Sequence, residues 1–553
     1  MCGIFSVINR EIDNNIYKAF LKGKARGPED SSIQTNDNNV ILGFHRLAIN
    51  GLNSESSQPF RISNCKLICN GEIYNYKSLA NQHNIILKTD SDCEIIIHLY
   101  KKFGIHSTLQ LLDGVFAFVL LDELNNNIFI ARDRFGVRPL FKQTIEEVTP
   151  ELGHNFYVYA SELKVIKSLN YGYESCIKSF EPGTYTSLIL TTNHYYTIHE
   201  EQSYYTFPKI DYSLNDLNFI NSQIVEYFTN AVKKRVVDTT ERPIACLLSG
   251  GLDSSIVAAL VAKYYGAEKL ETYSIGLLGS EDLKYANIVA QYLGTKHTSL
   301  TLTEDEFFEA IPEVIKNIES YDTTTVRASV GNYLIGKYIK NNSKAKVIFN
   351  GDGSDELMGG YLYFNFSPNS SEFDKECKRL LKDIHYFDVL RSDRSISSHG
   401  LEPRTPFLDY QWVNKFLSIS PDIRFNTEGT EKFLFRNAFA KLYPDLLPND
   451  ILWRTKEAFS DGVSSINKSW FLIIAEKIQY LYKFDFIKTS LDEILQKDNN
   501  MTLEKAYYKF LFNKDYQNLD HIIPYLWMPK FVNATDASAR TLKSYKKPIA
   551  IGV

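Results

Sequence analysis

The chain has 553 residues, enough for two to four domains at about 100–200 residues each. Its 61 Lys and Arg against 66 Asp and Glu give a net charge of −5, which argues against a general nucleic-acid or membrane-surface binder that needs a strong cationic field. With 44% hydrophobic and 23% charged residues, the composition excludes a disordered or fibrous protein. A small-molecule partner is therefore expected.

Nothing in the chain predicts a membrane segment or a secretory leader. The longest apolar runs, 115–121 and 256–262, are far shorter than the roughly 20 residues that a membrane-spanning helix needs. The first ten residues lack the basic start and apolar stretch of a secretory signal. The seven cysteines are scattered without a CxxC pair, which favours neither a disulfide framework nor a zinc site. We therefore expect a cytoplasmic protein.

The first 190 or so residues have an α+β pattern of short strands with a few helices. Helical spacing of apolar residues covers 92–103. The strand-like segments are 3–8, 40–48, 66–69, 115–122 and 127–133, and the last two form a hairpin around an Asn-rich turn. A polar, tyrosine-rich stretch follows, and we expect a linker at 206–216 between a domain at 1–205 and a second at 217–553.

Beyond the linker, strands alternate with helices. The expected strands are 243–248, 271–275 and 346–349, and the expected helices lie at about 217–237, after Asp253 and around 282–293. Such alternation predicts a parallel sheet that is covered on both faces, an α/β domain. After about residue 370 the pattern is mostly helical.

Cys2 is the first residue that points to chemistry. A cysteine after the initiator Met can become the mature N-terminus, so that thiol and α-amine share one residue. Because a thiolate is the reactive form, an amine that titrates near neutrality can serve as its base. Taken alone this is a weak signal, since most cysteines are simply buried.

Six motifs that follow in order strengthen that signal. They are Arg26-Gly27-Pro28-Glu29-Asp30, His45-Arg46-Leu47-Ala48-Ile49, Asn70-Gly71-Glu72-Ile73-Tyr74-Asn75, Ser91-Asp92-Cys93-Glu94, Asp113-Gly114-x-Phe116-Ala117-Phe118 and Arg132-Asp133-Arg134-Phe135-Gly136-x-Arg138-Pro139-Leu140. Together they resemble the glutaminase domain of class II glutamine amidotransferases, which implies an N-terminal nucleophile fold, an αββα sandwich.

The resemblance implies that Cys2 attacks the side-chain amide of glutamine and releases ammonia. Asn70 and the Gly71 N–H would stabilise the oxyanion, because an attacked amide needs two aimed donors. Arg46 would pair with the α-carboxylate of glutamine and Asp92 with its α-ammonium. Without the motifs, Arg46 and Asp92 would be read as a structural ion pair. The same motifs add Leu47, Ile49 and Glu72 to the glutamine-binding set.

A Gly/Ser turn between a buried strand and a helix marks a second site, Leu248-Ser249-Gly250-Gly251-Leu252-Asp253-Ser254-Ser255. Backbone N–H groups and a helix N-terminus that converge in this way bind phosphate oxygens. The lysine of a Walker loop is missing, and a plain N-cap is the alternative interpretation.

This turn resembles the loop of the ATP-pyrophosphatase family, whose members cleave ATP between the α- and β-phosphates to adenylate a carbonyl oxygen. Asp253 would then help to coordinate Mg²⁺, since phosphates need a hard cation with oxygen ligands. Leu248 and Ile275 are candidate contacts for adenine, although both could equally be core residues. Ser249, Gly250, Gly251, Ser254 and Ser255 complete the predicted ATP loop.

Four further stretches resemble asparagine synthetases of the glutamine-hydrolysing type: 320–329, 351–361, 399–409 and 453–462. By this resemblance Gly353 and Ser354 lie against the nucleotide. Glu356 would accept a proton as ammonia attacks an aspartyl adenylate. Lys456 and Arg327 would neutralise charge on pyrophosphate and the intermediate. For an isolated Glu or Lys, a solvated surface charge is the commoner role.

The expected reaction converts aspartate, ATP and glutamine to asparagine, AMP, diphosphate and glutamate, with ATP and Mg²⁺ required. We expect no nucleic acid and no membrane as partner, and a homodimer is left open. Three rivals remain: a β-lactam-forming synthetase, which lacks Cys2 and has Tyr for Glu356; a tRNA-modifying adenylating enzyme; and a silent regulatory relative. Departures from the family pattern occur at Asn50-Gly51, Asp352 and Thr405, and none removes a catalytic group.

Overall fold

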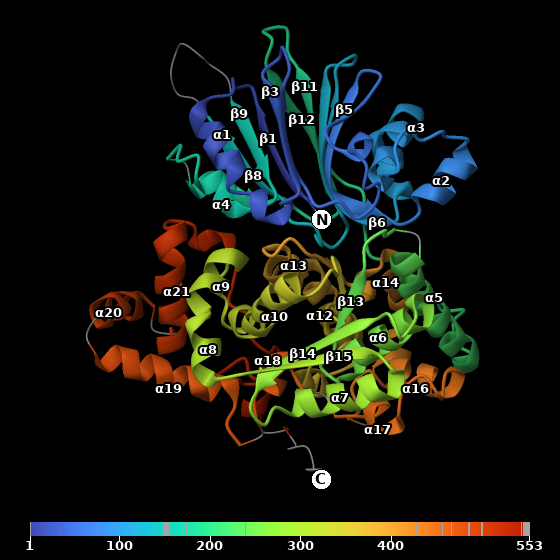
Figure 1. The fold of residues 1–553 in the computed structure, drawn as a ribbon, viewed down its shortest axis with the longest axis vertical. Helices are drawn as coiled ribbons and strands as arrows, with labels where there is room; N and C mark the ends of the chain where they lie inside the picture. Colours follow the sequence, from blue (N-terminus) through green and yellow to red (C-terminus); the bar gives the residue numbers. More distant parts are fainter. Residues whose placement is uncertain are drawn as a thin grey trace.

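The computed structural model describes residues 2–146, 155–172, 174–237, 239–425, 429–455, 457–465, 467–484, 487–498, 501–542 and 545. The chain forms two bodies, one stacked on the other (Figure 1). We call residues 2–203 the first half and residues 217–545 the second half. In the described part of the chain, no helix combines the length and the apolar character needed to cross a membrane.

The first half contains two antiparallel sheets that pack face to face. One sheet has the order β10 (Ile177–Ser179), β8 (Phe141–Ile145), β9 (Phe156–Ala160), β1 (Gly3–Ile8), β3 (Val40–Arg46) and β2 (Asp30–Thr35). The other has the order β12 (Tyr196–Ser203), β11 (Thr184–Leu190), β7 (Asn127–Arg132), β6 (Gly114–Asp122), β5 (Cys65–Ile73) and β4 (Phe60–Ile62). Alternating residues such as Ile4, Leu42, Ile68 and Val119 fill the space between them.

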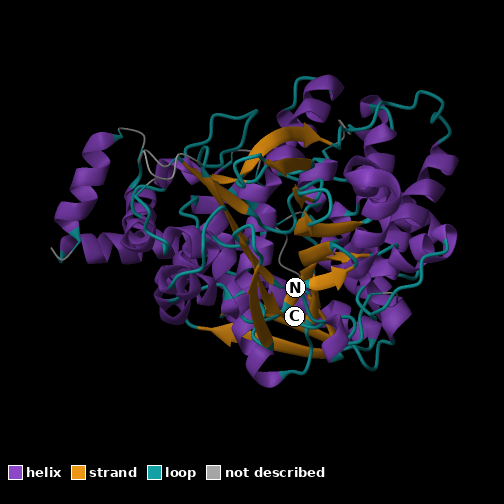
Figure 2. Ribbon diagram, turned by 90° about the horizontal axis from the view of Figure 1, so that it is seen from above, coloured by secondary structure: helices purple, strands orange, loops and turns teal. Residues whose placement is uncertain are grey.

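Helices cover both outer faces of this sandwich. The first sheet carries α1 (Asn14–Leu21) and α4 (Leu163–Lys167), and the second carries α2 (Tyr76–His83) and α3 (Ile95–Leu111). Seen from above, the strands lie at the centre of the molecule with helices around them (Figure 2). The predicted αββα fold is confirmed. The helix expected at 92–103 begins with a 3-10 turn, Asp92–Glu94, and continues past a break at Gly104.

The second half is built on a parallel sheet, as predicted. Its strand order is β15 (Lys296–Leu302), β14 (Glu271–Leu277), β13 (Ile244–Leu247), β16 (Val347–Phe349) and β17 (Glu402–Arg404). The edge strands β15 and β17 were not expected: β15 is polar and half-exposed, and β17 has three residues with a proline in the middle. Both lack the apolar run that marks a buried strand.

Helices cover both faces of the parallel sheet. On one face lie α5 (Leu217–Val237), α6 (Leu252–Tyr265) and α7 (Glu281–Leu293), and on the other lie α9 (Ile311–Ile318) and α10 (Thr323–Asn342). The remaining helices are α8 (Glu304–Glu309), α11 (Ser354–Met358), α12 (Ser370–Asp383), α13 (Asp388–Ser397), α14 (Tyr410–Ser418), α15 (Pro421–Arg424), α16 (Phe433–Leu442), α17 (Asn449–Leu452), α18 (Phe459–Gly462), α19 (Trp470–Lys483), α20 (Lys488–Lys497) and α21 (Leu503–Tyr516).

Candidate active sites in the two halves

Cys2 lies at the start of β1, beside the end of β3. The antiparallel register places Gly3 opposite His45, which brings Cys2 next to Arg46. The thiol is half-buried and donates to the Leu47 carbonyl at 3.7 Å. Burial raises the pKa of the Cys2 thiol, while the positive charge of the amino terminus works against that shift. The half-buried cysteine thus depends on nearby positive charge to favour the thiolate.

Asn70 presents an unused donor beside Cys2. Its Oδ1 accepts the Cys2 N–H at 3.0 Å, and its Nδ2 is buried without a hydrogen-bond partner among the described residues. A buried donor without a partner costs about 1–3 kcal/mol unless a ligand satisfies it. Nδ2 is therefore available to an oxygen that approaches Cys2.

The Gly71 N–H also points away from the neighbouring strand β6. Gly71 stands opposite Phe116, whose N–H and C=O both bond to Asp133 on the other side. In an antiparallel ladder this makes Gly71 and Phe116 a non-hydrogen-bonded pair, so the Gly71 N–H faces the free edge beyond the end of β4. A Cβ at this position would meet the Val115 carbonyl oxygen at 2.6 Å, which explains the glycine.

The side chains of Arg46 and Asp92 are fixed by hydrogen bonds to main-chain groups. The Arg46 guanidinium donates through Nη2 to the carbonyl oxygens of Gly51 and Asn53, at 2.5 and 2.8 Å. Asp92 accepts from the Ile73 N–H at 2.6 Å, and burial raises the pKa of its carboxyl. A buried carboxylate of raised pKa gains by meeting a cation, which suits the predicted contact with an α-ammonium group.

The buried carboxylate of Glu72 connects the first site to the second half. Its Oε2 accepts from Asn50 Nδ2 at 2.9 Å and lies 3.5 Å from Arg404 Nη2. Burial, with the nearby charges of Asp92 and Glu402, raises the pKa of Glu72 well above its usual range. Asn50 therefore lies between the carboxylates of Glu72 and Asp92, whose negative charges repel each other.

A second ionic contact reaches Cys2 from the other side. Arg26 is fully buried and forks onto Asp393 of α13 at 2.7 and 3.2 Å, while its Nε donates to the Cys2 carbonyl at 3.1 Å. Arg138 lies 3.7 Å from the same carboxylate. Removing one partner of such a buried group would leave an uncompensated charge. The main chain at Cys2 is thus bonded to Arg26 of the first half, whose guanidinium is held by Asp393 of the second half.

The predicted phosphate loop joins β13 to α6. Gly250 has φ +71°, and a Cβ there would meet Tyr285 at 2.4 Å. Ser254 Oγ lies 3.0 Å from Ser249 Oγ and 3.2 Å from the Ser249 N–H, which fixes the turn. Ser249, Gly251, Asp253 and Ser254 line a cavity of about 170 Å³, whereas Gly250 and the fully buried Ser255 lie behind its wall.

The cavity has an apolar wall and a polar wall. Leu248 and Ile275, at the carboxyl ends of β13 and β14, line it, as does Gly353 with φ +90°. In an open parallel sheet, this edge is where ligands bind. The residues predicted to contact ATP therefore converge, with Ser354 just beyond the wall.

Lys432 is a functional candidate that the sequence analysis missed. Its Nζ lies 2.6–2.7 Å from both Asp253 carboxylate oxygens, 2.6 Å from Asp355 Oδ1 and 2.8 Å from Ser354 Oγ. The side chain is 1% exposed. It comes from the residue before α16, far along the chain, in the left-handed conformation at φ +57°. No local motif marked it.

Asp253 and Asp355 fit a divalent cation in part. Their carboxylates converge on one positive charge in the structure, and both face the cavity. Within the described ranges, no group of three or more metal-binding side chains occurs. Mg²⁺ usually keeps one or two carboxylates and takes its other ligands from phosphates and water, so these residues fit that ion beside a nucleotide.

Glu356 is buried, at 4% exposure, and does not line the nucleotide cavity itself, whereas Tyr361, which bonds to it, does. Its Oε1 accepts from the Tyr361 hydroxyl at 2.5 Å, and its Oε2 has no partner among the described residues. Burial, with the charges of Asp388 and Asp355, raises the pKa of Glu356 well above its usual range. A second, small cavity of about 30 Å³ is lined by Glu356, Asp388 and Arg391.

One predicted residue does not line the cavity, and another lies outside the described residues. Arg327 is the residue that does not line it, and it binds Glu504 at 2.6 and 2.8 Å and Asp536 at 2.7 and 2.8 Å. Its contact with pyrophosphate stays a prediction. Lys456 lies outside the described residues, between Thr455 and Glu457, which both line the cavity. Arg454, whose Nη2 donates to Asp282 at 3.0 Å, also lines it and was not singled out from the sequence.

Comparisons with known proteins agree with this division. A family model described as glutamine amidotransferase domain matches residues 1–198, and one described as asparagine synthase matches residues 223–372 and 365–479. The chain is 39% identical, over 99% of both chains, to the asparagine synthetase [glutamine-hydrolyzing] of Mus musculus. It is also 39% identical to the Homo sapiens protein of the same name, with coverages of 99% of this chain and 100% of that protein. Among solved structures, glutamine phosphoribosylpyrophosphate amidotransferase from B. subtilis covers 54% of this chain and 81% of its own, at 17% identity and a TM-score of 0.31.

Proposed function

The chain belongs to the family of glutamine-hydrolysing asparagine synthetases, and from this premise we propose how its residues divide the work. The enzyme uses glutamine as nitrogen donor and ATP to convert aspartate to asparagine. The balanced reaction is L-aspartate + ATP + L-glutamine + H₂O → L-asparagine + AMP + diphosphate + L-glutamate. The assignment rests on the observation that one chain contains both the Cys2–Asn70 pair and the cavity at the β13–α6 loop.

We propose that the first half, ending at about residue 205, hydrolyses glutamine. The Cys2 thiolate attacks the amide carbon, and the oxygen that becomes negative is stabilised by Asn70 Nδ2 and the Gly71 N–H. The leaving nitrogen takes the proton that the Cys2 amine accepted from the thiol and departs as ammonia. Water then cleaves the glutamyl thioester to glutamate and the free thiol. Arg46 and Asp92, with Leu47, Ile49 and Glu72 around them, hold the two ends of glutamine.

The second half, from about residue 217, is proposed to bind ATP at Ser249–Ser255, Gly353 and Ser354, between Leu248 and Ile275. Asp253 and Asp355 would hold Mg²⁺, which screens the charge of the phosphates when bound. The β-carboxylate of aspartate attacks the α-phosphorus, and diphosphate leaves. Lys432, Lys456 and Arg327 are the cations proposed to stabilise the departing charge.

Aspartate itself is proposed to lie between this cavity and the small one beside Glu356. Arg391 and Asp388 line both cavities and lie 2.6 Å apart, so they offer a cation for the α-carboxylate and an anion for the α-ammonium. In this proposal the activated carboxyl group lies near Oε2 of Glu356.

Glu356 is the proposed base. Ammonia attacks the acyl carbon of the adenylate, Oε2 takes the proton from nitrogen, and AMP leaves with the bridging oxygen. Because burial raises the pKa of Glu356, the carboxyl group must lose its proton at a higher pH than an ordinary glutamate. We therefore expect the acid limb of the pH–rate profile of synthesis to lie well above pH 4.5.

Cellular context is proposed on two observations. All seven cysteines are free, which suits a reducing compartment such as the cytoplasm. Neither a membrane nor a nucleic acid is needed for the reaction. The homodimer stays a prediction that the native molecular mass would check.

The assignment is tested by incubating the enzyme with glutamine, aspartate, ATP and Mg²⁺ and following AMP and asparagine. Cys2→Ala should abolish glutamine-dependent synthesis and leave ammonia-dependent synthesis intact. Cys176→Ala, which removes an exposed thiol, is the matched control and should change neither. Release of ADP in place of AMP, or loss of both syntheses in Cys2→Ala, would contradict the proposal.

A further inference from the structure

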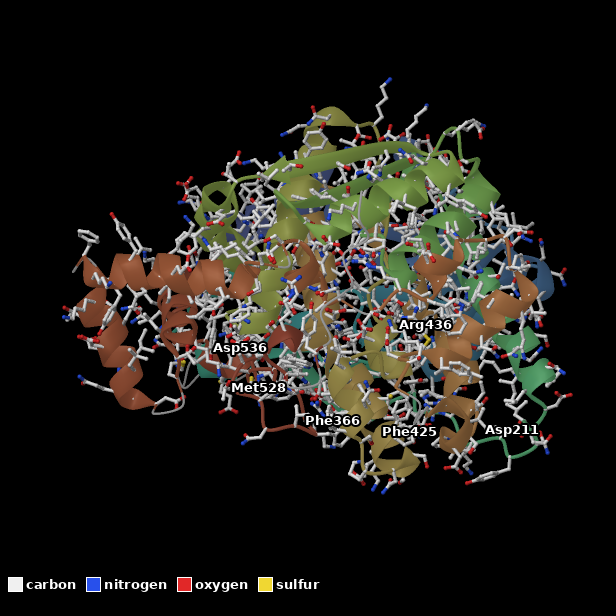
Figure 3. All side chains as sticks on the ribbon, turned by 90° about the horizontal axis from the view of Figure 1, so that it is seen from below. Asp211, Phe366, Phe425, Arg436, Met528 and Asp536 are labelled. Carbon is white, nitrogen blue, oxygen red and sulfur yellow. The ribbon has the colours of Figure 1, made fainter. Side chains whose placement is uncertain are left out.

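The last part of the chain, residues 527–542 and 545, runs across the second half without forming an α-helix, and we call it the C-terminal strap. Met528 and Asp536, both on this strap, are seen on the lower face of the second half (Figure 3). Its first residue touches the wall that carries the proposed base. The Trp527 N–H donates to Asp322 at 2.7 Å, and the Trp527 ring lies 5.3 Å from that of Tyr361, which donates to Glu356.

The other end of the strap holds the opposite wall of the nucleotide cavity. This wall is the Glu457 loop, residues 454–465 without 456, in which Glu457 lines the cavity. Arg540 donates to the Ser465 carbonyl at 2.8 Å, and its Nε lies 3.4 Å from Glu457 Oε2. The Tyr545 hydroxyl donates to the other oxygen of Glu457.

Two further contacts fix the middle of the strap. Ser538 donates to Asp461 Oδ1 at 2.7 Å, on the same loop. Asp536 forms a two-pronged pair with Arg327 of α10, at 2.7 and 2.8 Å. The strap is therefore attached to α10 and to the Glu457 loop by charge-assisted bonds, the stronger kind of hydrogen bond.

The ion pair between Glu457 and Arg540 is buried. The side chains of Glu457 and Arg540 are 3% and 7% exposed. Among the described residues, the Glu457 carboxylate has two partners, Arg540 and Tyr545, both on the strap. A buried carboxylate that loses its cation is costly, so without the strap Glu457 would turn toward water and move the loop.

The rest of the loop is held elsewhere. Leu277 N–H donates to the Val463 carbonyl at 2.7 Å, and Ser280 Oγ donates to the Gly462 carbonyl at 2.7 Å. These bonds fix the far end of the loop to β14 and to the start of α7. In the part of the chain that the structure describes, the strap alone supplies partners to the side chain of Glu457, which follows Lys456 directly in the sequence.

We propose that Arg540 is a positioning residue of the adenylating site: through Glu457 and Ser465 it holds the loop in the conformation that lines the nucleotide cavity. Arg540 touches no reacting atom. This inference rests on the proposed function of the cavity, and it adds a requirement that the C-terminal strap be present for ATP and aspartate to react.

The proposal predicts that the two half-reactions respond differently. The hydrogen bonds and ion pairs of the strap with other described residues all lie within the second half, so hydrolysis of glutamine should not depend on Arg540. Adenylation should, because a displacement of about 1 Å in a supporting loop can cost on the order of 100-fold in rate.

The experiment compares Arg540→Ala, Arg540→Lys and the control Lys530→Ala in the full chain. Lys530 is a strap cation that is 40% exposed and pairs with Glu376 at 3.4 Å, away from the loop. Aspartate-dependent exchange of labelled diphosphate into ATP measures adenylation, and glutamate release from glutamine measures the first half. The exchange activity of the unmodified enzyme tests the proposed function by itself.

We expect Arg540→Ala to lower exchange by about 10- to 100-fold and to raise KM for ATP, with glutaminase activity unchanged. Arg540→Lys should recover part of the exchange by restoring the charge opposite Glu457, and Lys530→Ala should match the unmodified enzyme. Normal exchange and normal KM for ATP in Arg540→Ala would overturn the proposal. So would an equal loss of both half-reactions, because it would indicate general unfolding. If Arg540→Ala cannot be purified, Ser538→Ala must show the same one-sided loss in milder form.

Discussion

In the first half, the reacting residues stand on or beside neighbouring strands: Cys2 at β1, Arg46 at the end of β3 and Asn70 on β5. In the second half, the cavity is assembled from loops that come from distant parts of the chain, such as Asp253, Lys432 and Glu457. Strand pairing fixes Cys2 beside Arg46 through main-chain bonds, and Asn70, from the other sheet, meets Cys2 through one hydrogen bond. The second arrangement depends on buried ion pairs between side chains. Residues that hold the second site should therefore be numerous and far from any motif.

The two sites also differ in what they leave unpaired. In the first, Asn70 Nδ2 is a donor that waits for an oxygen. In the second, Glu356 Oε2 is an acceptor that waits for a proton. The unpaired donor suits the attack of a thiolate on an amide, and the unpaired acceptor suits the attack of ammonia on an acyl group. One substitution can remove either of these polar atoms.

The largest expected effect comes from removing the proposed base Glu356, which should affect the second site and not the first. Glu356→Gln should lower synthesis of asparagine by about 10²- to 10⁴-fold, because the nitrogen loses its base. Glutamate release from glutamine should be unchanged. Glu309→Gln, at an exposed glutamate of α8, is the matched control. Retention of more than about a tenth of the synthesis rate in Glu356→Gln would rule out this role.

The next largest effect comes from removing the oxyanion donor Asn70, which should affect the first site and not the second. Asn70→Ala should lower kcat for glutamine hydrolysis by about 10²- to 10³-fold, the usual loss for one oxyanion donor. Asn70→Asp keeps an oxygen to accept the Cys2 N–H but lacks the amide donor, so it should be impaired to a similar degree. Synthesis from ammonia is the internal control, and a matching loss there would show that Asn70 supports the fold instead.

A smaller effect sharpens the contrast in how the sites are supported. Burial raises the pKa of Asp461, on the Glu457 loop, to about 6 from the ordinary 3.8. Between these values the unfolded chain releases the proton and the native protein keeps it, so stability falls as pH rises toward 6 and stays lower above it. The full cost is at most about 3 kcal/mol.

Asp461→Asn should remove this dependence while still accepting the bond from Ser538. Its melting temperature relative to the unmodified enzyme should be higher at pH 8 than at pH 5. A difference that stays constant over this range would mean that Asp461 titrates as an ordinary surface carboxylate.

The fold class and the first site could be predicted because their information is local. Arg46 ends β3, Asn70 lies on β5 and Asp92 begins a 3-10 turn, and each belongs to a short glutaminase motif. The Gly/Ser turn before α6 has its own composition. Lys432 and Arg540 could not be found in this way, since each reaches its site from a separate segment and acts through a buried pair. The sequence showed that Arg327 is charged, but it did not show that Glu504 and Asp536 lie opposite it.

Transfer of nitrogen from one half to the other is the central claim, and isotope labelling tests it most directly. Glutamine carrying ¹⁵N in its amide is supplied together with an equal concentration of unlabelled ammonium, and the product asparagine is analysed by mass spectrometry. If ammonia passes within the protein from Cys2 toward Glu356, the asparagine amide will be almost entirely ¹⁵N. Label diluted to the ratio present in bulk solvent would contradict the account.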